Sequence, residues 1–184
     1  MLLTSIQTRD LLEQYSIPVP STVYANSFGE LVEKAQTLSF PLVLKVASPD
    51  ATHKTERGLV QLGIRDFDEL LLEFRQVEKK AEDLSIDAFV LQEQVKGVEF
   101  IIGGKKDPVF GQTLLFGLGG VLTELLGDYS IRICPLKEKD VLQLMSETKA
   151  NAFFQGFRGK KASRPKIVDV MLKTSKLLEN KHFS

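Results

Sequence analysis

Hydrophobic and polar residues along this chain show two kinds of spacing, one typical of helices and the other of strands. Apolar residues three or four positions apart predict amphipathic helices over 5–15 and 66–84. Short apolar runs bounded by turn-forming residues predict strands at 41–46, 58–64, 87–95, 97–104, 112–118 and 130–136. From Lys137 onward the spacing is helical in three pieces, interrupted around 156–165. Strands gathered in the middle of the chain indicate an α/β or α+β fold.

Two local signals mark where helices begin and end. The segment 16–21 holds two prolines, which stop the first helix because proline lacks the backbone donor that a helix needs. Ser27 is followed three residues later by Glu30, the spacing of a capping box. We therefore expect a second helix to start just after Ser27.

Composition and charge narrow the class of protein. The chain has 184 residues, 43% hydrophobic and 26% charged, which is typical of a soluble globular protein in one domain or two small lobes. Its 24 basic residues balance 24 acidic ones, so no overall field attracts nucleic acid or a membrane. One cysteine, no signal-peptide pattern and no membrane-length apolar run predict a cytoplasmic protein.

Two basic residues lie close to an apolar run that reads as a buried strand. Lys45 interrupts this run, either pointing to solvent from an edge strand or reaching into a cleft to hold a phosphate. His53 follows in the charged loop "SPDATHKTERG", as a surface residue or as a catalyst. Neither residue decides between these alternatives alone.

The segment "FGLGGVLTELLGD" breaks an apolar strand with several glycines. Clustered glycines let backbone N–H groups approach an anion, although a bulge or a tight turn uses them too. Glu124, Asp128 and Arg132 follow at intervals of four residues. These side chains predict either a site for Mg²⁺ and phosphate or a solvated hairpin with a surface ion pair.

A connector, "EQVKGVE", separates two of the predicted strands. Glu93 ends one strand and Glu99 begins the next, with Gly97 turning the chain between them. Its backbone groups could meet an adenine edge while a carboxylate reaches ribose hydroxyls. The simpler alternative is an ordinary hairpin.

A basic cluster lies near the end of the chain: Arg158, Lys160, Lys161, Arg164 and Lys166. Such a cluster can attract nucleic acid, but only Phe157 accompanies it as an aromatic platform. We therefore interpret it as the solvated start of a helix, with no nucleic-acid partner.

Taken in order, four segments closely resemble one family, the ATP-grasp β subunit of ADP-forming acyl-CoA synthetases, which are similar to succinyl-CoA synthetases. The segments are "YSIPVP", "FPLVLKVASPDATHKTERG", "VLQEQVKGVEFIIGGKKDPVFG" and "LLFGLGGVLTELLGDYSIRICPL". The resemblance extends into "KANAFFQGFRG" and covers roughly Tyr15 to Gly159. It implies an α+β ATP-grasp fold, with two α/β lobes around a nucleotide cleft.

The resemblance also implies how the chain is divided. We expect a single ATP-grasp domain over 1–184, with a smaller lobe over about 15–92 and a second lobe over 93–184. Members of the family continue into an acidic D-x-N-P segment, so the second lobe is expected to be truncated at its C-terminal part. In the family two glycines precede valine after the HKTE motif, whereas this chain has Leu59. Leu59 thus brings a branched side chain to a position where a phosphate-facing backbone is expected.

The activity that the resemblance implies is the conversion of an acyl-CoA, ADP and phosphate into a free acid, ATP and CoA. This acid–CoA ligase chemistry requires ATP or ADP with Mg²⁺ and a CoA-binding α subunit, in a hetero-oligomer without nucleic acid or membrane. The alternative is a degenerate or truncated module that binds nucleotide, or the α partner, without turnover.

Each candidate residue takes a role from the same resemblance. His53 would carry the phosphoryl group as a phosphohistidine, and Lys45 would neutralise nucleotide phosphates. The resemblance places four further nucleotide-site residues and one metal ligand at these positions: Glu93 and Val95 at adenine, Glu99 at ribose, Arg132 near phosphate, and Glu124 on Mg²⁺.

Overall fold

The computed structural model describes residues 3–49, 57–120 and 127–180. The chain forms two compact units. One comprises Leu2–Asp10 with Val19–Val95, and the other comprises Met1, Leu11–Pro18 and Lys96–Ser184. The first helix, α1 (Ser5–Gln14), is divided between the two sets of residues after Asp10.

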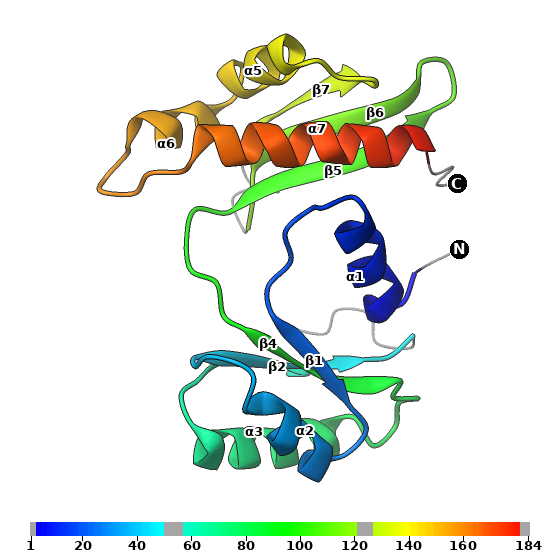
Figure 1. Ribbon diagram of the computed structural model, residues 1–184, viewed down its shortest axis with the longest axis vertical. Helices are drawn as coiled ribbons and strands as arrows, with labels where there is room; N and C mark the ends of the chain where they lie inside the picture. Colours follow the sequence, from blue (N-terminus) through cyan, green and yellow to red (C-terminus); the bar gives the residue numbers. More distant parts are fainter. Residues whose placement is uncertain (1–2, 50–56, 121–126, 181–184) are drawn as a thin grey trace. The chain divides into compact units, whose positions relative to one another are not determined.

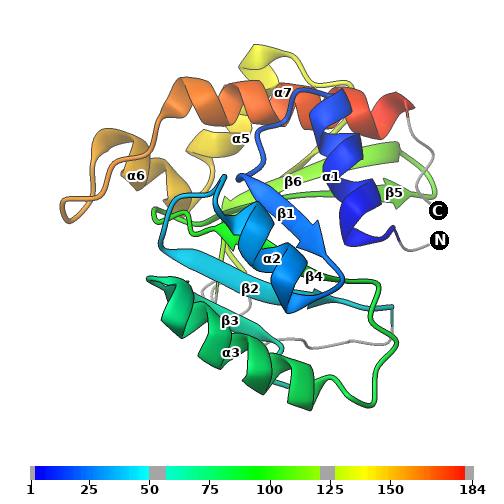
Figure 2. The same ribbon diagram turned by 60° about the horizontal axis from the view of Figure 1, so that its bottom comes forward.

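The first unit is built on a four-stranded antiparallel sheet in the order β1-β4-β2-β3. The strands are β1 (Thr22–Ala25), β2 (Leu42–Ala47), β3 (Val60–Ile64) and β4 (Ala88–Glu93). Two helices, α2 (Phe28–Ala35) and α3 (Phe67–Lys80), cover one face of this sheet (Figures 1 and 2).

Side-chain caps and apolar stripes explain these two helices. Ser27 caps α2 by accepting a hydrogen bond from the backbone N–H of Glu30 at 3.3 Å, as the sequence predicts. The Glu30 carboxylate reaches back to the N–H of Asn26, one residue before the cap. Asp66 caps α3 in the same way, at 2.8 Å from the N–H of Glu69.

The core of the first unit joins the buried stripe of α3 to the sheet. The Phe74 ring lies 4.6 Å from that of Phe89 on β4 and 5.1 Å from that of Phe28 on α2. Leu59 is fully buried in the same core. Burial against other apolar side chains directs the Leu59 side chain into the core, so it does not point at the position where a phosphate-facing backbone is expected.

The second unit pairs three antiparallel strands, β5 (Phe100–Asp107), β6 (Gly111–Leu118) and β7 (Tyr129–Ile133), in that order. Two helices, α5 (Glu138–Ser146) and α7 (Arg164–Asn180), pack on one face of this sheet (Figure 1). Between them lie a 3-10 turn, η1 (Lys149–Asn151), and the short helix α6 (Ala152–Gln155).

Three stacked rings hold the core of the second unit together. The Phe100 ring lies 5.6 Å from that of Phe116 and 5.3 Å from that of Phe154, which joins the strands to α6. Gly104 on β5 leaves room for Leu178 of α7, because an added Cβ there would overlap the leucine side chain. Among the described helices, none is long and apolar enough to cross a membrane.

The predicted strands and helices agree with the observed elements apart from β1. That strand has only four residues and follows a proline-rich turn, so its alternation is too short to recognise. It is found because its backbone pairs with β4, from Thr22 opposite Gln92 to Ala25 opposite Phe89.

Candidate functional site

Lys45 lies in the interior of the first sheet. Its strand, β2, pairs with β4 on one side and with β3 on the other, so the edge-strand alternative is wrong. Leu44 and Val46 face the helices, and alternation along the strand therefore places Lys45 on the opposite face.

A polar relay holds the Lys45 ammonium on this half-buried face. Its Nζ donates to Oε1 of Gln92 at 2.6 Å, and Nε2 of Gln92 donates to the Thr22 hydroxyl at 2.9 Å. The Gln92 amide thus links the Lys45 ammonium on β2 to the Thr22 hydroxyl on β1.

Glu93 and Val95 lie at the end of the first unit. Glu93 pairs with the buried Leu42, so its side chain lies on the helix-covered face, opposite to Lys45. Its carboxylate accepts a hydrogen bond of 2.8 Å from the backbone N–H of Ser39, and this bond is the main cause that lowers the pKa of Glu93. The Val95 side chain is 74% exposed. The structure therefore does not bring the side chains of Lys45 and Glu93 together.

Glu99 lines a pocket of about 230 Å³ in the second unit. The pocket lies where β5 begins and β6 ends, and the backbone N–H of Gly119 donates to the Glu99 carbonyl at 2.8 Å. Its lining residues are Gly97, Val98, Glu99, Leu118, Gly119, Gly120, Phe153 and Lys160.

The glycine pair makes room for Glu99. A Cβ on Gly119 would lie 2.9 Å from the backbone carbon of Phe100, closer than side chains tolerate. Gly120 has a φ of +67°, and a Cβ there would collide with the Glu99 carboxylate. Glycine at these two positions therefore lets the backbone turn and leaves the carboxylate at the pocket surface.

Two charged side chains of opposite sign line this pocket, Glu99 and Lys160. Within the described part of the chain, neither side chain makes an ion pair or a hydrogen bond. The sequence prediction identified Glu99 but missed Phe153, which lies on α6, and Lys160, which belongs to the basic cluster interpreted as a solvated helix start. The Arg158-Gly159 dipeptide, a turn signal just before Lys160, is the feature that could have located it.

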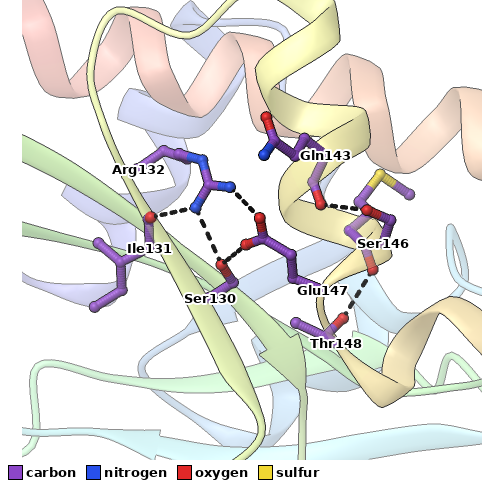
Figure 3. A network of polar contacts seen from close by, with 8 residues as sticks. Ser130, Ile131, Arg132, Gln143, Ser146, Glu147 and Thr148 are labelled. Atoms are coloured by element: carbon purple, nitrogen blue, oxygen red, sulfur yellow. Dashed lines mark hydrogen bonds and ion pairs between the residues drawn. The ribbon is translucent and has the colours of Figure 1, made fainter.

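Arg132 lies in a different environment, shown in Figure 3. It pairs with Leu114 across the sheet, so its side chain lies on the helix-covered face. Its guanidinium donates to the Ser130 hydroxyl at 3.3 Å, to the Ile131 carbonyl at 2.9 Å and to the Glu147 carboxylate. The hydrogen bond from Arg132, followed by that from Ser130, lowers the pKa of Glu147.

The structure therefore does not place Arg132 in the Glu99 pocket. The backbone around Arg132 borders a larger pocket of about 460 Å³ over the other face of the sheet, with Ile101, Leu115 and Ile133. The guanidinium itself joins β7 to the end of α5.

His53 and Glu124, the expected phosphoryl carrier and metal ligand, lie outside the described residues. Across residues 3–49, 57–120 and 127–180, no group of three His, Cys, Asp or Glu side chains could hold a metal ion. Glu99 alone supplies one carboxylate to its pocket, which does not make a Mg²⁺ site without further oxygen ligands.

Comparison with known proteins places this geometry in a family. An ATP-grasp domain model matches residues 1–182. The β subunit of ADP-forming acetate–CoA ligase II from Pyrococcus furiosus is 34% identical over 95% of this chain and 76% of the relative. The ADP-forming acetate–CoA ligase I of Archaeoglobus fulgidus is 37% identical over 91% of this chain, which spans only 25% of that protein.

Solved structures agree with these relatives. An acetyl-coenzyme A synthetase 1 of Ca. Korarchaeum cryptofilum, bound to coenzyme A and Ca-AMPCP, superimposes with a TM-score of 0.91 at 32% identity, covering 97% of this chain and 81% of that one. A second structure of that enzyme, with a TM-score of 0.85 at 32% identity and covering 98% of this chain and 80% of that one, holds coenzyme A and Mg-AMPPCP. There a phosphohistidine segment points towards the nucleotide-binding site.

These matches confirm the predicted α+β ATP-grasp fold and the resemblance on which it was based. The relatives are ADP-forming acid–CoA ligases or their β subunits. The chain belongs to the ATP-grasp domain family and is homologous to the β subunits of ADP-forming acetyl-CoA synthetases.

Proposed function

We propose that this chain is the nucleotide-binding part of an ADP-forming acyl-CoA synthetase. The observation that carries the proposal is the Glu99 pocket, in which two glycines leave one carboxylate open at the junction of β5 and β6. In a chain of the ATP-grasp family, such a carboxylate is suited to accept hydrogen bonds from the ribose hydroxyls of ADP or ATP.

The proposed reaction requires a CoA-binding α partner in a hetero-oligomer. On the partner, acyl-CoA and phosphate exchange to give an acyl phosphate and free CoA. The phosphoryl group then passes to a histidine of the partner, which releases the free acid, and from there to a ring nitrogen of His53. Transfer from that nitrogen to ADP gives ATP and restores the histidine, so a covalent intermediate divides one long transfer into two short ones.

The other nucleotide residues take roles that fit their surroundings. Lys45, solvated by Gln92 on an interior strand, would neutralise phosphate charge. The connector at Glu93 and Val95 would meet adenine through its backbone, since the Glu93 carboxylate is already bonded to Ser39. Arg132 would act indirectly, by fixing β7 through Glu147.

In this proposal, Glu124 and the nucleotide phosphates would bind Mg²⁺. Mg²⁺ prefers a few carboxylates together with substrate phosphates and water, rather than a closed set of protein ligands. When bound, it would offset charge that develops on the phosphate oxygens.

Nucleotide binding is the first test. Isothermal titration calorimetry with ADP should give a measurable affinity for the wild-type chain and a lower one for Lys45→Met, which keeps the length of the side chain. Lys79→Met, on the last turn of α3, is the matched control and should bind as wild type. Equal ADP affinity in all three proteins would remove Lys45 from the site.

The phosphoryl relay is tested separately, in the complex with its α partner. Radiolabel from γ-labelled ATP should enter the wild-type chain in an acid-labile and alkali-stable form and be absent from His53→Asn. Equal labelling of the two chains would exclude His53. A complex that binds ADP but takes up no label would favour the alternative, a module without turnover.

A further inference from the structure

Lys160 lines the Glu99 pocket although it lies some sixty residues further along the chain, within the basic cluster before α7. Its side chain is exposed and, within the described residues, has no charged or hydrogen-bonding partner. Other cations of the same segment are engaged. Arg158 lies over the Phe157 ring at 5.5 Å, and Arg164 lies over the Phe154 ring at 5.5 Å.

A tight turn fixes the backbone of Lys160. The N–H of Phe157 donates to the Lys160 carbonyl at 2.9 Å, and the N–H of Lys160 donates to the Phe157 carbonyl at 3.0 Å. The two residues between them both have positive φ, +49° at Arg158 and +75° at Gly159. Positive φ at both central positions is the geometry of a type I′ turn.

The turn is unusual because its first central residue is arginine, where type I′ turns prefer asparagine, aspartate or glycine. A side chain in the left-handed region costs about 1–2 kcal/mol, so surrounding contacts must hold Arg158 there. The Phe157 ring supplies one such contact to the guanidinium and packs edge-on against Phe153 at 5.5 Å. Phe153, in turn, lines the pocket.

The same ring therefore connects the turn to the pocket wall. The Phe153 carbonyl also accepts from the N–H of Ala162 at 2.9 Å, which ties down the chain on the far side of Lys160. The backbone on both sides of Lys160 is therefore held in place, and the lysine lines a pocket whose other charged lining residue is Glu99.

We propose that Lys160 binds a phosphate group of the same ligand whose hydroxyl groups donate hydrogen bonds to Glu99. This pocket would then select phosphorylated nucleosides over nucleosides. This inference rests on the proposed function, in which the ligand is a nucleotide. A carboxylate alone would favour a neutral polyol and would repel a phosphate. The added ammonium offsets that repulsion and supplies a charge-assisted hydrogen bond to a phosphate oxygen.

The contribution should be measurable but moderate, because Lys160 is exposed and its field is screened by salt. Hydrogen bonds to charged groups predict a loss of about tenfold in affinity for a phosphorylated ligand when the ammonium is removed. Adenosine has no phosphate, so its affinity should not change.

The experiment is calorimetric titration of the full chain with ADP, AMP and adenosine, at low and at moderate salt. We expect Lys160→Ala to bind ADP and AMP about tenfold more weakly, with a smaller salt dependence, and adenosine as wild type does. Lys160→Arg should recover most of the affinity. Lys161→Ala, its exposed neighbour outside the pocket lining, is the matched control and should match wild type.

Several results would overturn the inference. Equal ADP affinity in Lys160→Ala and Lys161→Ala would show that Lys160 does not contact the ligand. An equal loss for adenosine and ADP would show that Lys160 only shapes the pocket wall. A wild-type chain that binds none of ADP, AMP and adenosine would overturn the proposed function and this inference with it. ADP binding that Lys160→Ala leaves unchanged would overturn the inference alone.

Discussion

Two charged regions of the second unit contain the same kinds of groups and use them differently. Around Arg132, the guanidinium, the Ser130 hydroxyl and the Glu147 carboxylate bond to one another and join β7 to α5. In the pocket, Glu99 and Lys160 both lack such partners among the described residues. Charges that satisfy one another hold elements together, while charges left open remain available for a ligand.

The largest effect that would test this contrast is the loss of ADP binding on removal of Glu99. Glu99→Ala deletes a charged hydrogen-bond acceptor, so we expect ADP affinity to fall tenfold to a hundredfold, equivalent to about 1.5–3 kcal/mol. Calorimetry measures this directly. Glu138→Ala, an exposed carboxylate on the first turn of α5, is the control and should leave the affinity unchanged. A Glu99→Ala chain that binds ADP as tightly as wild type would refute the pocket assignment.

Filling the space beside Glu99 should have the next largest effect. Gly120→Ala adds a Cβ at positive φ that collides with the carboxylate, so we expect a loss of stability of about 1–2 kcal/mol together with weaker ADP binding. Urea unfolding and calorimetry report the two effects. Gly103→Ala on β5 is the matched control, because no atom lies within 4 Å of its added Cβ. If both variants behaved alike, steric crowding at Gly120 would not matter.

Breaking the ion pair between Arg132 and Glu147 should change the free energy of unfolding but not the affinity for ADP. In a double-mutant cycle with Arg132→Met and Glu147→Gln, we expect a small stabilising coupling, because both side chains are partly exposed, at 27% and 38%, and water screens the ion pair. Denaturant unfolding of the four proteins measures the coupling. Strictly additive losses would show that the ion pair contributes nothing.

The smallest effect is a dependence of that network on pH. The folded-state pKa of Glu147 is lowered below its ordinary value of 4.5, chiefly by the hydrogen bond from Arg132. Its contribution is therefore fully present above about pH 4.5 and is lost as the pH falls through the lower, folded-state pKa. The stability difference between wild type and Glu147→Gln should shrink on acidification from about pH 6 to about pH 3. A constant difference would contradict this assignment.

Much of this architecture follows from periodicity and local chemistry. The cap at Ser27, the α3 stripe and most strands are encoded by short-range patterns that neighbouring residues determine. Strand order is not local, so the sequence pattern could not show that β2 lies inside its sheet and that Lys45 therefore leaves an interior strand.

The sequence predicted only some of the residues that line the pocket. Glu99 and the glycine pair come from adjoining strands with a family pattern, and their proximity follows from the pairing of β5 with β6. Phe153 and Lys160 reach the pocket through tertiary packing of the segment after α5, for which periodicity carries no signal. At Leu59 the sequence comparison showed a departure from the family motif, but only the packing of the core determines where that side chain lies.

The turn at Phe157–Lys160 has a consequence for the affinity with which a ligand binds. A lysine on a free loop loses backbone and side-chain freedom when it closes on a phosphate, and this entropy subtracts from the binding free energy. Here paired backbone hydrogen bonds and the Arg158–Phe157 contact already restrict the backbone. Only the lysine side chain remains to be ordered when a phosphate binds. The strained turn at Arg158 therefore lowers the entropy cost of binding, because it fixes the backbone of Lys160 beforehand.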